Sequence, residues 1–325
     1  MTARRLLVPT LGALGMRPSR LLAVAALVAA AAPAGCGLGA GKGPGGVSVT
    51  VTRDFGTTTL GSARTADAPG GETVMRFLER RFDVKTRYGG GFVQSIQGVS
   101  GGREGGRPRD WFYYVNGVEA GQGAAATKLH AGDRVWWDRH DWGTAMRVPA
   151  VVGSFPEPFR SGTQGKRLPV QILCSPGAGA ACAEAKRRLS AVGVNGGSAA
   201  WGSPPGELTL RLVVGPWREV RSDLVARPLE SGPGTTGVYA RPAASGDRID
   251  LIDARGATVR ALRAGGGLVA ATSLQGAAPT WVLTGTDAAG TLAAARSLTE
   301  RALRNRFALA LERGRAVSLP AGGAR

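Results

Sequence analysis

The chain has 325 residues, which is long enough for two ordinary domains after removal of any leader. Apolar residues make up 43% of it and charged residues 20%, which excludes a disordered chain. Its formal net charge of +18 indicates anionic surroundings such as phospholipid headgroups, a phosphate-rich polymer or a phosphate-bearing ligand. Because the basic residues are scattered singly and form no long run, we interpret them as a solvated surface and expect no nucleic-acid partner.

The N-terminal segment is typical of an export signal. Arg17 and Arg20 precede the uncharged apolar segment 21–32, which is too short to span a bilayer. We therefore predict a signal peptide over residues 1–35. Met16 is an alternative start, because a leader that begins there has a more ordinary length.

Cys36 is the predicted point of attachment to a membrane. Residues 34–36 (AGC) resemble a lipoprotein processing signal, in which the cysteine becomes the acylated first residue, although Pro33 stands where leucine is usual. Residues 32–34 (APA) resemble an ordinary secretion site, so secretion is the alternative. We favour the lipoprotein because ordinary cleavage leaves Cys36 as an odd free thiol. The protein is then expected on the outer face of the cell membrane, spaced from it by a Gly-rich tether at 36–46.

Two further cysteines, Cys174 and Cys182, stand eight positions apart. In an oxidising compartment they are predicted to form a disulfide, with two free buried thiols as the alternative. Because the closed loop is short, the expected stabilisation is modest, about 2–3 kcal/mol.

Residues 47–142 are predicted to form a first domain rich in strands. Its alternating and periodic segments predict a strand at 47–52 with a hairpin partner at 57–60, a short amphipathic helix opening at 71–73, an extended segment over 92–99 and a loop at 101–109. An aromatic strand at 111–115 follows and ends at Asn116-Gly117, a strong hairpin signal, before another strand at 134–138. One face of the aromatic strand is expected in the core, which leaves the other face potentially exposed.

The order of these elements and three motifs resemble the DUF4430 domain over about 47–142. The motifs are Phe92-x-x-Ser95-Ile96-x-Gly98, Trp111-Phe112-Tyr113-Tyr114-Val115-Asn116-Gly117 and Leu129-x-x-Gly132-Asp133. That family is similar to the C-terminal β-grasp domain of the cobalamin carriers transcobalamin and intrinsic factor. The resemblance implies a β-grasp fold and the capture of a corrinoid such as cobalamin or another bulky small molecule. Because the carriers share their ligand with a helical barrel that this chain lacks, it also implies a helical-barrel or importer partner.

The candidate ligand-binding residues follow from this resemblance and from their chemistry. An aromatic sheet could cover a corrin ring and arginines could bind its phosphate, which selects Trp111, Tyr113, Trp136, Trp137, Asn116, Arg107, Arg109 and Arg139. Core or interface packing is the alternative for the aromatic residues, and a turn role is the alternative for Asn116. His130 and His140 lack metal-ligand spacing, so no metal site is expected.

The rest of the chain is predicted to be an ordered linker at 143–169, a second α/β domain at 170–315 and a disordered tail at 316–325. Phe155 and Phe159 favour a linker that packs against both domains. Strands are expected at 170–173, 208–214, 237–240, 248–252, 267–271 and 281–284, with helices at 181–191, 217–229 and 288–311, the last capped by Thr286 or Asp287. The predicted fold class is α+β, a β-grasp-like domain followed by a separate α/β sandwich.

No catalytic motif is present, so we expect a protein that is not an enzyme and needs no cofactor. The leading hypothesis is a surface lipoprotein that binds a small molecule, such as a corrinoid, for uptake by an importer. An adaptor that docks on another exported protein is the alternative, and an envelope enzyme is a minor one.

Overall fold

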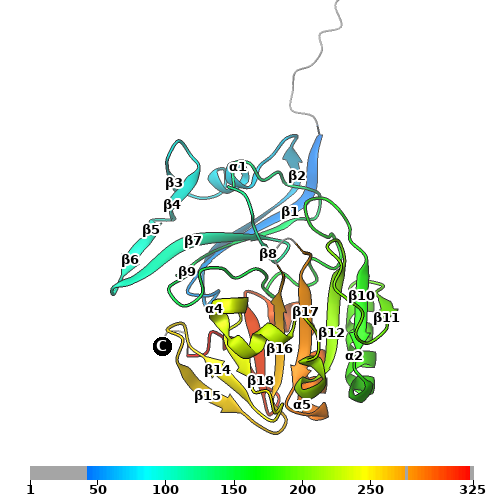
Figure 1. The fold of residues 1–325 in the computed structure, drawn as a ribbon. Coiled ribbons are helices and arrows are strands. Elements are labelled where there is room, and N and C mark those ends of the chain that lie inside the picture. Colours follow the sequence, from blue (N-terminus) through cyan, green and yellow to red (C-terminus); the bar gives the residue numbers. More distant parts are fainter. Residues whose placement is uncertain (1–41, 275–276, 323–325) are drawn as a thin grey trace, which may run out of the picture. The chain divides into compact units, whose positions relative to one another are not determined.

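The computed structural model describes residues 42–274 and 277–322 (Figure 1). The predicted signal peptide, Met16 and the predicted lipidation site Cys36 lie outside these residues. Ala40–Arg325 form one compact unit, and the three hydrophobic core clusters all lie inside it. Among the described helices, none has the length and apolar character needed to cross a membrane.

The first sheet has the strand order β2-β1-β9-β7-β6, and β8 pairs with β7. Its strands are β1 (Lys42–Arg53), β2 (Thr58–Pro69), β6 (Gly102–Glu104), β7 (Arg107–Val115), β8 (Val118–Glu119) and β9 (Arg134–Asp141). β1 runs parallel to β9 and antiparallel to β2, while β7 runs antiparallel to β9. Helix α1 (Val74–Glu79) and a small sheet of β3 (Val84–Arg87), β4 (Phe92–Ile96) and β5 (Val99–Ser100) complete this region.

The two faces of the first sheet differ because apolar and polar residues alternate along β1. Val47, Val49 and Val51 are buried on one face, in a core cluster with Phe77 and Leu78 of α1. The other face carries the polar residues of β1 and turns toward the second sheet. This arrangement confirms the predicted strand at 47–52 and the predicted β-grasp architecture.

Two local predictions for this region were wrong. Residues 101–109 form no loop: Gly102–Glu104 pair with Arg107–Arg109, and Gly105 and Gly106 make the turn with positive φ. The tether predicted at 36–46 overlaps β1, which already begins at Lys42. The hairpin turn at Asn116-Gly117 is confirmed, because both residues have positive φ and β8 pairs back onto β7.

The second sheet has the order β11-β10-β12-β17-β16-β18-β19. Its strands are β10 (Val170–Cys174), β11 (Gly197–Ala199), β12 (Leu210–Pro216), β16 (Gly267–Thr272), β17 (Thr280–Gly285), β18 (Ala308–Glu312) and β19 (Arg315–Leu319).

Helices α2 (Gly179–Ser190) and α5 (Ala288–Arg296) share a core cluster with one face of the second sheet. The other face shares a cluster with α3 (Trp217–Val220), the 3₁₀ helix η2 (Arg227–Ser231), and the small sheet of β13 (Ala240–Pro242), β14 (Ile249–Ile252) and β15 (Thr258–Leu262). A 3₁₀ turn η1 (Pro176–Ala178) precedes α2, and α4 (Pro233–Thr236) and α6 (Glu300–Leu303) are single turns. The α+β fold class is confirmed.

The long helix predicted at 288–311 is wrong beyond its first half. Asp287 caps α5 by accepting a hydrogen bond from the Gly290 N–H, but the helix ends at Arg296. Thr299 then caps the separate turn α6. Residues 308–311 form part of β18, and their side chains are buried on both faces of the second sheet. A strand that is buried on both faces is apolar at every position, and this continuous apolar segment was mistaken for the end of a helix.

The helix predicted at 217–229 ends early because of Asp223. Its carboxylate pairs with the buried Arg211 and accepts hydrogen bonds from the N–H groups of Val225 and Ala226, which turns the chain. The tail predicted at 316–325 also differs, since β19 pairs with β18 through Leu319. The disulfide Cys174–Cys182 is confirmed, with a Cα–Cα distance of 5.9 Å.

One core cluster joins the two sheets. Phe307 is buried between them, and its ring centroid lies 5.1 Å from that of Phe55, 5.2 Å from that of Trp136 and 5.7 Å from that of Tyr114. Phe155 and Phe159 of the segment 143–169 are also buried, and both contact Trp281 of the second sheet. The second face of the aromatic strand is therefore covered by the second half of the chain.

Candidate functional site

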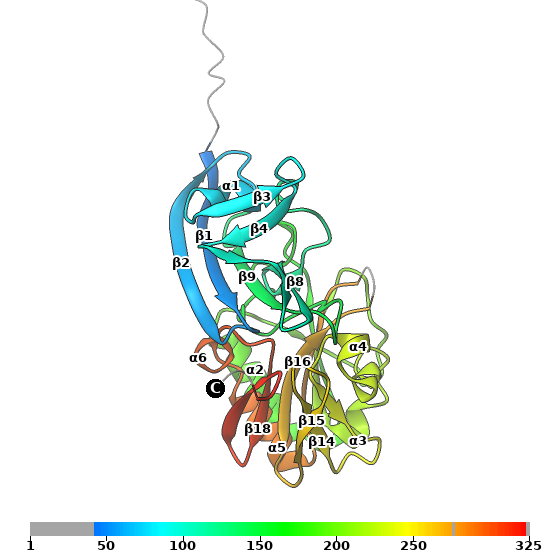
Figure 2. The same ribbon diagram turned by 90° about the vertical axis from the view of Figure 1, so that its left-hand side faces the viewer.

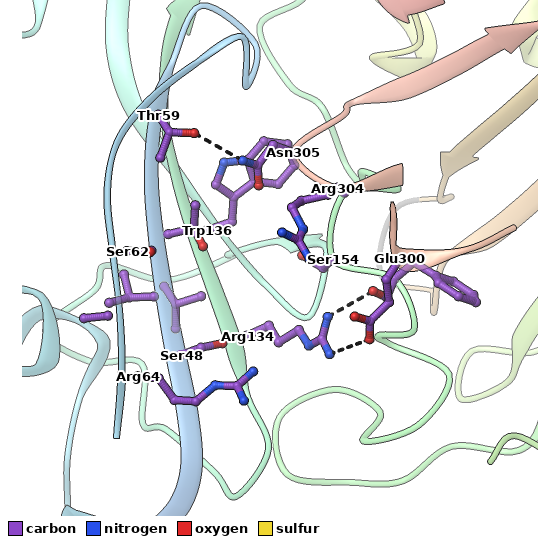
Figure 3. Close-up of a pocket in the computed structure, with 16 residues that line it drawn as sticks. Ser48, Thr59, Ser62, Arg64, Arg134, Trp136, Ser154, Glu300, Arg304 and Asn305 are labelled. Carbon is purple, nitrogen blue, oxygen red and sulfur yellow. Dashed lines mark hydrogen bonds and ion pairs between the residues drawn. The ribbon is translucent and has the colours of Figure 1, made fainter. Parts of the chain in front are cut away.

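A cleft of about 470 Å³ lies between the polar face of the first sheet and the residues around α6 (Figure 3). We call it the polar cleft. It is lined by Ser48, Val49, Thr50, Thr59, Ser62, Ala63, Arg64, Arg134, Val135, Trp136, Gly153, Ser154, Phe155, Glu300, Arg304 and Asn305. Its volume lies within the range of about 300–1,000 Å³ that is usual for small-molecule sites.

The sheet wall of the polar cleft is set by strand register. Ser48 of β1 pairs with Arg64 of β2 on one side and with Arg134 of β9 on the other. Thr50 pairs in the same way with Ser62 and Trp136. Because residues paired across a sheet point to the same face, two rows of polar side chains and one indole form this wall.

The opposite wall comes from the second half of the chain. Arg134 reaches across and pairs with Glu300 of α6 at 2.9 Å, and it also donates a hydrogen bond of 3.0 Å to the Phe155 carbonyl. The Asn305 side chain donates a 3.4 Å hydrogen bond to Thr59 on β2. These contacts link the two walls of the cleft directly.

The polar cleft has an excess of positive charge. Glu300 is the single carboxylate among its lining residues, against the guanidinium groups of Arg64, Arg134 and Arg304. Only Arg134 has an ion-pair partner within the part of the chain that the structure describes. Figure 3 shows the three arginine side chains extending from separate elements toward the same space. A ligand with one or two negative charges would therefore find two uncompensated guanidinium groups there.

Three of the predicted aromatic site residues lie in the core beneath α1. Trp111, Tyr113 and Trp137 are all at most 9% exposed, and the rings of Tyr113 and Trp137 stack with centroids 4.7 Å apart. Trp111 donates a hydrogen bond to the Val99 carbonyl. Burial raises the pKa of the Tyr113 hydroxyl. None of the three lines the polar cleft.

Trp136 and Asn116 occupy different surroundings. Trp136 is buried against Phe307, donates a 2.7 Å hydrogen bond to Thr52, and presents part of its indole to the polar cleft. Asn116 is 1% exposed, and its amide donates to the Asp133 carboxylate and the Gly162 carbonyl. Of the eight predicted ligand residues, Trp136 is the one that lines the polar cleft.

The three predicted arginines gather at the other end of the first sheet, and Arg109 lines a second cleft of about 350 Å³ there. Arg107 pairs with Asp141, Arg109 with Asp54 at 2.6 Å, and Arg139 with Glu104 at 2.8 Å. The hydrogen bond from Arg139 and the charge of Arg109 lower the pKa of Glu104. These three arginines are already neutralised by their carboxylate partners. An anionic ligand would therefore gain less electrostatic stabilisation from them than from the unpaired arginines of the polar cleft.

Sequence reasoning missed most lining residues of the polar cleft, including Arg64, Arg304 and Glu300. One signal for them was present: Ser48 and Thr50 alternate with the buried valines, which marks a polar sheet face. Within residues 42–274 and 277–322, no group of three or more His, Cys, Asp or Glu side chains is placed to hold a metal ion.

Comparisons with known proteins identify one segment. A structure from Ruminococcus gnavus described as a "putative metal binding protein" is similar to part of the chain, with 14% identity, a TM-score of 0.23, and coverage of 30% of this chain and 97% of that one. No curated protein matches the sequence. Residues 71–141 match the family described as a domain of unknown function, DUF4430. This segment, which spans α1 through β9, is therefore a DUF4430 domain, as its motifs predicted.

Proposed function

We propose that this protein is an exported, membrane-anchored binding protein that captures an anionic small molecule in the polar cleft. The observation that carries the proposal is the pair of uncompensated guanidinium groups, Arg64 and Arg304, that line the polar cleft. Export and anchoring rest on the leader pattern before Cys36. We assign the protein no reaction and no catalytic cofactor.

The chemistry of the cleft favours a phosphate or carboxylate on a larger polar body. Guanidinium groups bind such oxyanions through paired, charge-assisted hydrogen bonds. The hydroxyl groups of Ser48, Thr50 and Ser62 can donate to or accept from the rest of the ligand. Ser62 and Arg64 are exposed, so the cleft is open along β2. A ligand larger than the cleft could therefore place only its anionic edge inside.

A corrinoid with its nucleotide phosphate fits this description, as the resemblance to the cobalamin carriers implies. Its phosphate would contact Arg64 and Arg304, and its ring would lie outside the cleft. A partner protein, such as an importer or a helical barrel, would then cover the exposed part of the ring. Trp136 is the predicted aromatic residue placed to contact the ligand.

The test is isothermal titration of the compact unit Ala40–Arg325 with cyanocobalamin, with cobinamide, which lacks the nucleotide phosphate, and with inorganic pyrophosphate. We expect binding of a phosphate-bearing probe. Arg64→Ala or Arg304→Ala should weaken it by about tenfold to a hundredfold, the range for one charge-assisted hydrogen bond. Arg301→Ala is the matched control, because Arg301 lies on α6 but does not line the cleft.

Each probe decides one part of the proposal. Equal affinity for cobinamide and cyanocobalamin would remove phosphate recognition. Binding of pyrophosphate alone would keep an anion site and remove the corrinoid. If no probe binds, or if both arginine variants bind as the wild type does, the polar cleft is not the site.

An adaptor role is the second candidate, and the free edge of the first sheet favours it. β2 is an edge strand of 12 residues, and among the described strands it pairs with β1 alone. Such an edge can accept a strand from another protein through main-chain hydrogen bonds. Co-purification from solubilised membranes separates the two roles. An adaptor should bring down a stoichiometric protein partner, whereas a stand-alone receptor should not.

A further inference from the structure

The tip of the β3–β4 hairpin presents two aromatic side chains to solvent. Tyr88 is 86% exposed and Phe92 is 42% exposed, and their ring centroids lie 6.5 Å apart in an edge-to-face arrangement. Neither ring belongs to a core cluster. Tyr88 also has a φ of 53°, a left-handed conformation that is uncommon for a bulky residue. The two aromatic side chains at the hairpin tip are therefore exposed to solvent, and their exposed apolar area contributes nothing to the stability of the fold.

The base of the same hairpin is firmly held. Val93 and Ile96 of β4 are buried in the core cluster beneath the first sheet, and Val84 pairs with Ile96. The turn consists of Tyr88 and three glycines, of which Gly89 and Gly90 have positive φ. The buried base therefore anchors the hairpin on the domain, and the two rings lie at its solvent-exposed tip.

The charges on the hairpin itself are positive. Lys85 and Arg87 of β3 are exposed, and neither has an ion-pair partner within the described parts of the chain. No acidic residue occurs from Val84 through Gly102. On and just after the neighbouring helix α1, the exposed cations Arg76 and Arg81 stand beside the exposed acids Glu79 and Asp83, so the excess of positive charge is greatest at the hairpin. Aromatic rings flanked by cations match the interface of an anionic bilayer, where rings lie at headgroup level and cations meet lipid phosphates.

The position of the tip favours a membrane over a protein partner. In both views the β3–β4 turn lies at the same end of the described structure as the start of β1 (Figures 1 and 2). β1 begins at Lys42, six positions after Cys36. Six extended residues span at most about 20 Å, so an acyl chain on Cys36 would keep this end close to the lipid surface.

We propose that the β3–β4 tip, through Tyr88, Phe92, Lys85 and Arg87, is a second membrane contact that binds an anionic lipid surface. The choice of lipid over protein rests on the proposed anchoring at Cys36. Together the two contacts would fix the orientation of the DUF4430 domain on the membrane, because a single point of attachment would leave it free to rotate.

The experiment uses the compact unit Ala40–Arg325, which lacks Cys36, so that any binding is independent of the acyl anchor. Its co-sedimentation is measured with vesicles of phosphatidylcholine alone and of an equimolar mixture with phosphatidylglycerol. We expect binding to the anionic vesicles only. The double variant Tyr88→Ser/Phe92→Ser should lower the partition coefficient by about tenfold, and Lys85→Gln/Arg87→Gln by a similar factor.

The matched control is Leu208→Ser/Leu224→Ser, which removes two exposed apolar side chains from the second half of the chain. It should bind vesicles as the wild type does. Equal binding by the tip variants, or no binding of the unit to anionic vesicles, would overturn the proposal. Because the tip lines neither cleft, the tip variants should keep the calorimetric ligand binding of the wild type, so failure here leaves the proposed function intact.

Discussion

Phe307→Ala is expected to lower the free energy of unfolding by about 3–5 kcal/mol, the usual cost of removing a buried phenyl ring. Phe307 is 3% exposed and comes from the loop between α6 and β18, yet its aromatic neighbours belong to the first sheet and its β1–β2 turn: Phe55, Tyr114, Trp136 and His140. The perturbation therefore tests the junction between the two sheets more directly than a core substitution within either one.

The magnitude follows from the contacts of the ring. Its centroid lies 5.1 Å from those of Phe55 and His140 and 5.2 Å from that of Trp136, each at an interplanar angle of 73–81°. Edge-to-face pairs of this kind add about 0.5–1.5 kcal/mol each beyond the buried area. Alanine leaves a cavity among these rings, because Thr52 and Asp138 beneath them are fixed by hydrogen bonds and cannot move in to fill it.

The assay is urea unfolding of the unit Ala40–Arg325 followed by tryptophan fluorescence, to which Trp136 at the junction contributes together with six other tryptophans distributed over both halves of the chain. Leu208→Ala is the control: its side chain is 65% exposed, so it should change stability by less than about 0.5 kcal/mol. A loss below about 1 kcal/mol for Phe307→Ala would refute the shared core. A variant that unfolds in two separate transitions would instead show that the ring couples two otherwise independent halves.

Three further changes test individual parts of the fold. Cys174→Ser/Cys182→Ser should cost about 2–3 kcal/mol in urea unfolding, because the bridge closes a loop with a sequence separation of 8, and reductant should have no effect on this variant. Asp287→Ala should cost about 1–2 kcal/mol, since the carboxylate accepts hydrogen bonds from the N–H groups of Gly290 and Gly265; Asp287→Asn should recover part of the loss, and equal stability of all three proteins would contradict the cap. Arg139 lowers the pKa of Glu104 from its ordinary value of 4.5, so the carboxylate stabilises the folded state above that pH and the contribution is lost as pH falls through the lowered pKa. Glu104 is 55% exposed, so Glu104→Gln should cost less than about 1 kcal/mol at pH 7 and nothing at the acid end of a pH series of thermal melts; a difference that grows toward low pH would be inconsistent with this sign.

Much of the fold was readable from local patterns. The alternation at 47–52 specified β1 and its two faces, Asn116-Gly117 specified the turn after β7, and the motifs of 71–141 specified the DUF4430 domain. Each of these signals lies within a few residues of the structure that it determines, so no distant contact was needed to interpret it.

Two of the errors arose where a distant partner decided the outcome. Residues 308–311 could have continued a helix, but pairing with β16 and β19 made them a central strand. The helix predicted at 217–229 ended before Asp223, because the Asp223 carboxylate forms an ion pair with the buried Arg211, twelve positions earlier. In both cases, burial against another element outweighed a local preference of at most about 1 kcal/mol per residue.

The sequence by itself determined the central strands of the first sheet, the disulfide pair and the family of one segment. The tertiary structure alone decided which side chains share a cleft. Arg64, Arg134 and Arg304 are up to 240 positions apart and meet because strand pairing places two of them on one sheet face and the junction around Phe307 brings α6 opposite. Register and packing between sheets are long-range properties. No local pattern encodes them, so a binding site built from them becomes visible only once the chain is folded.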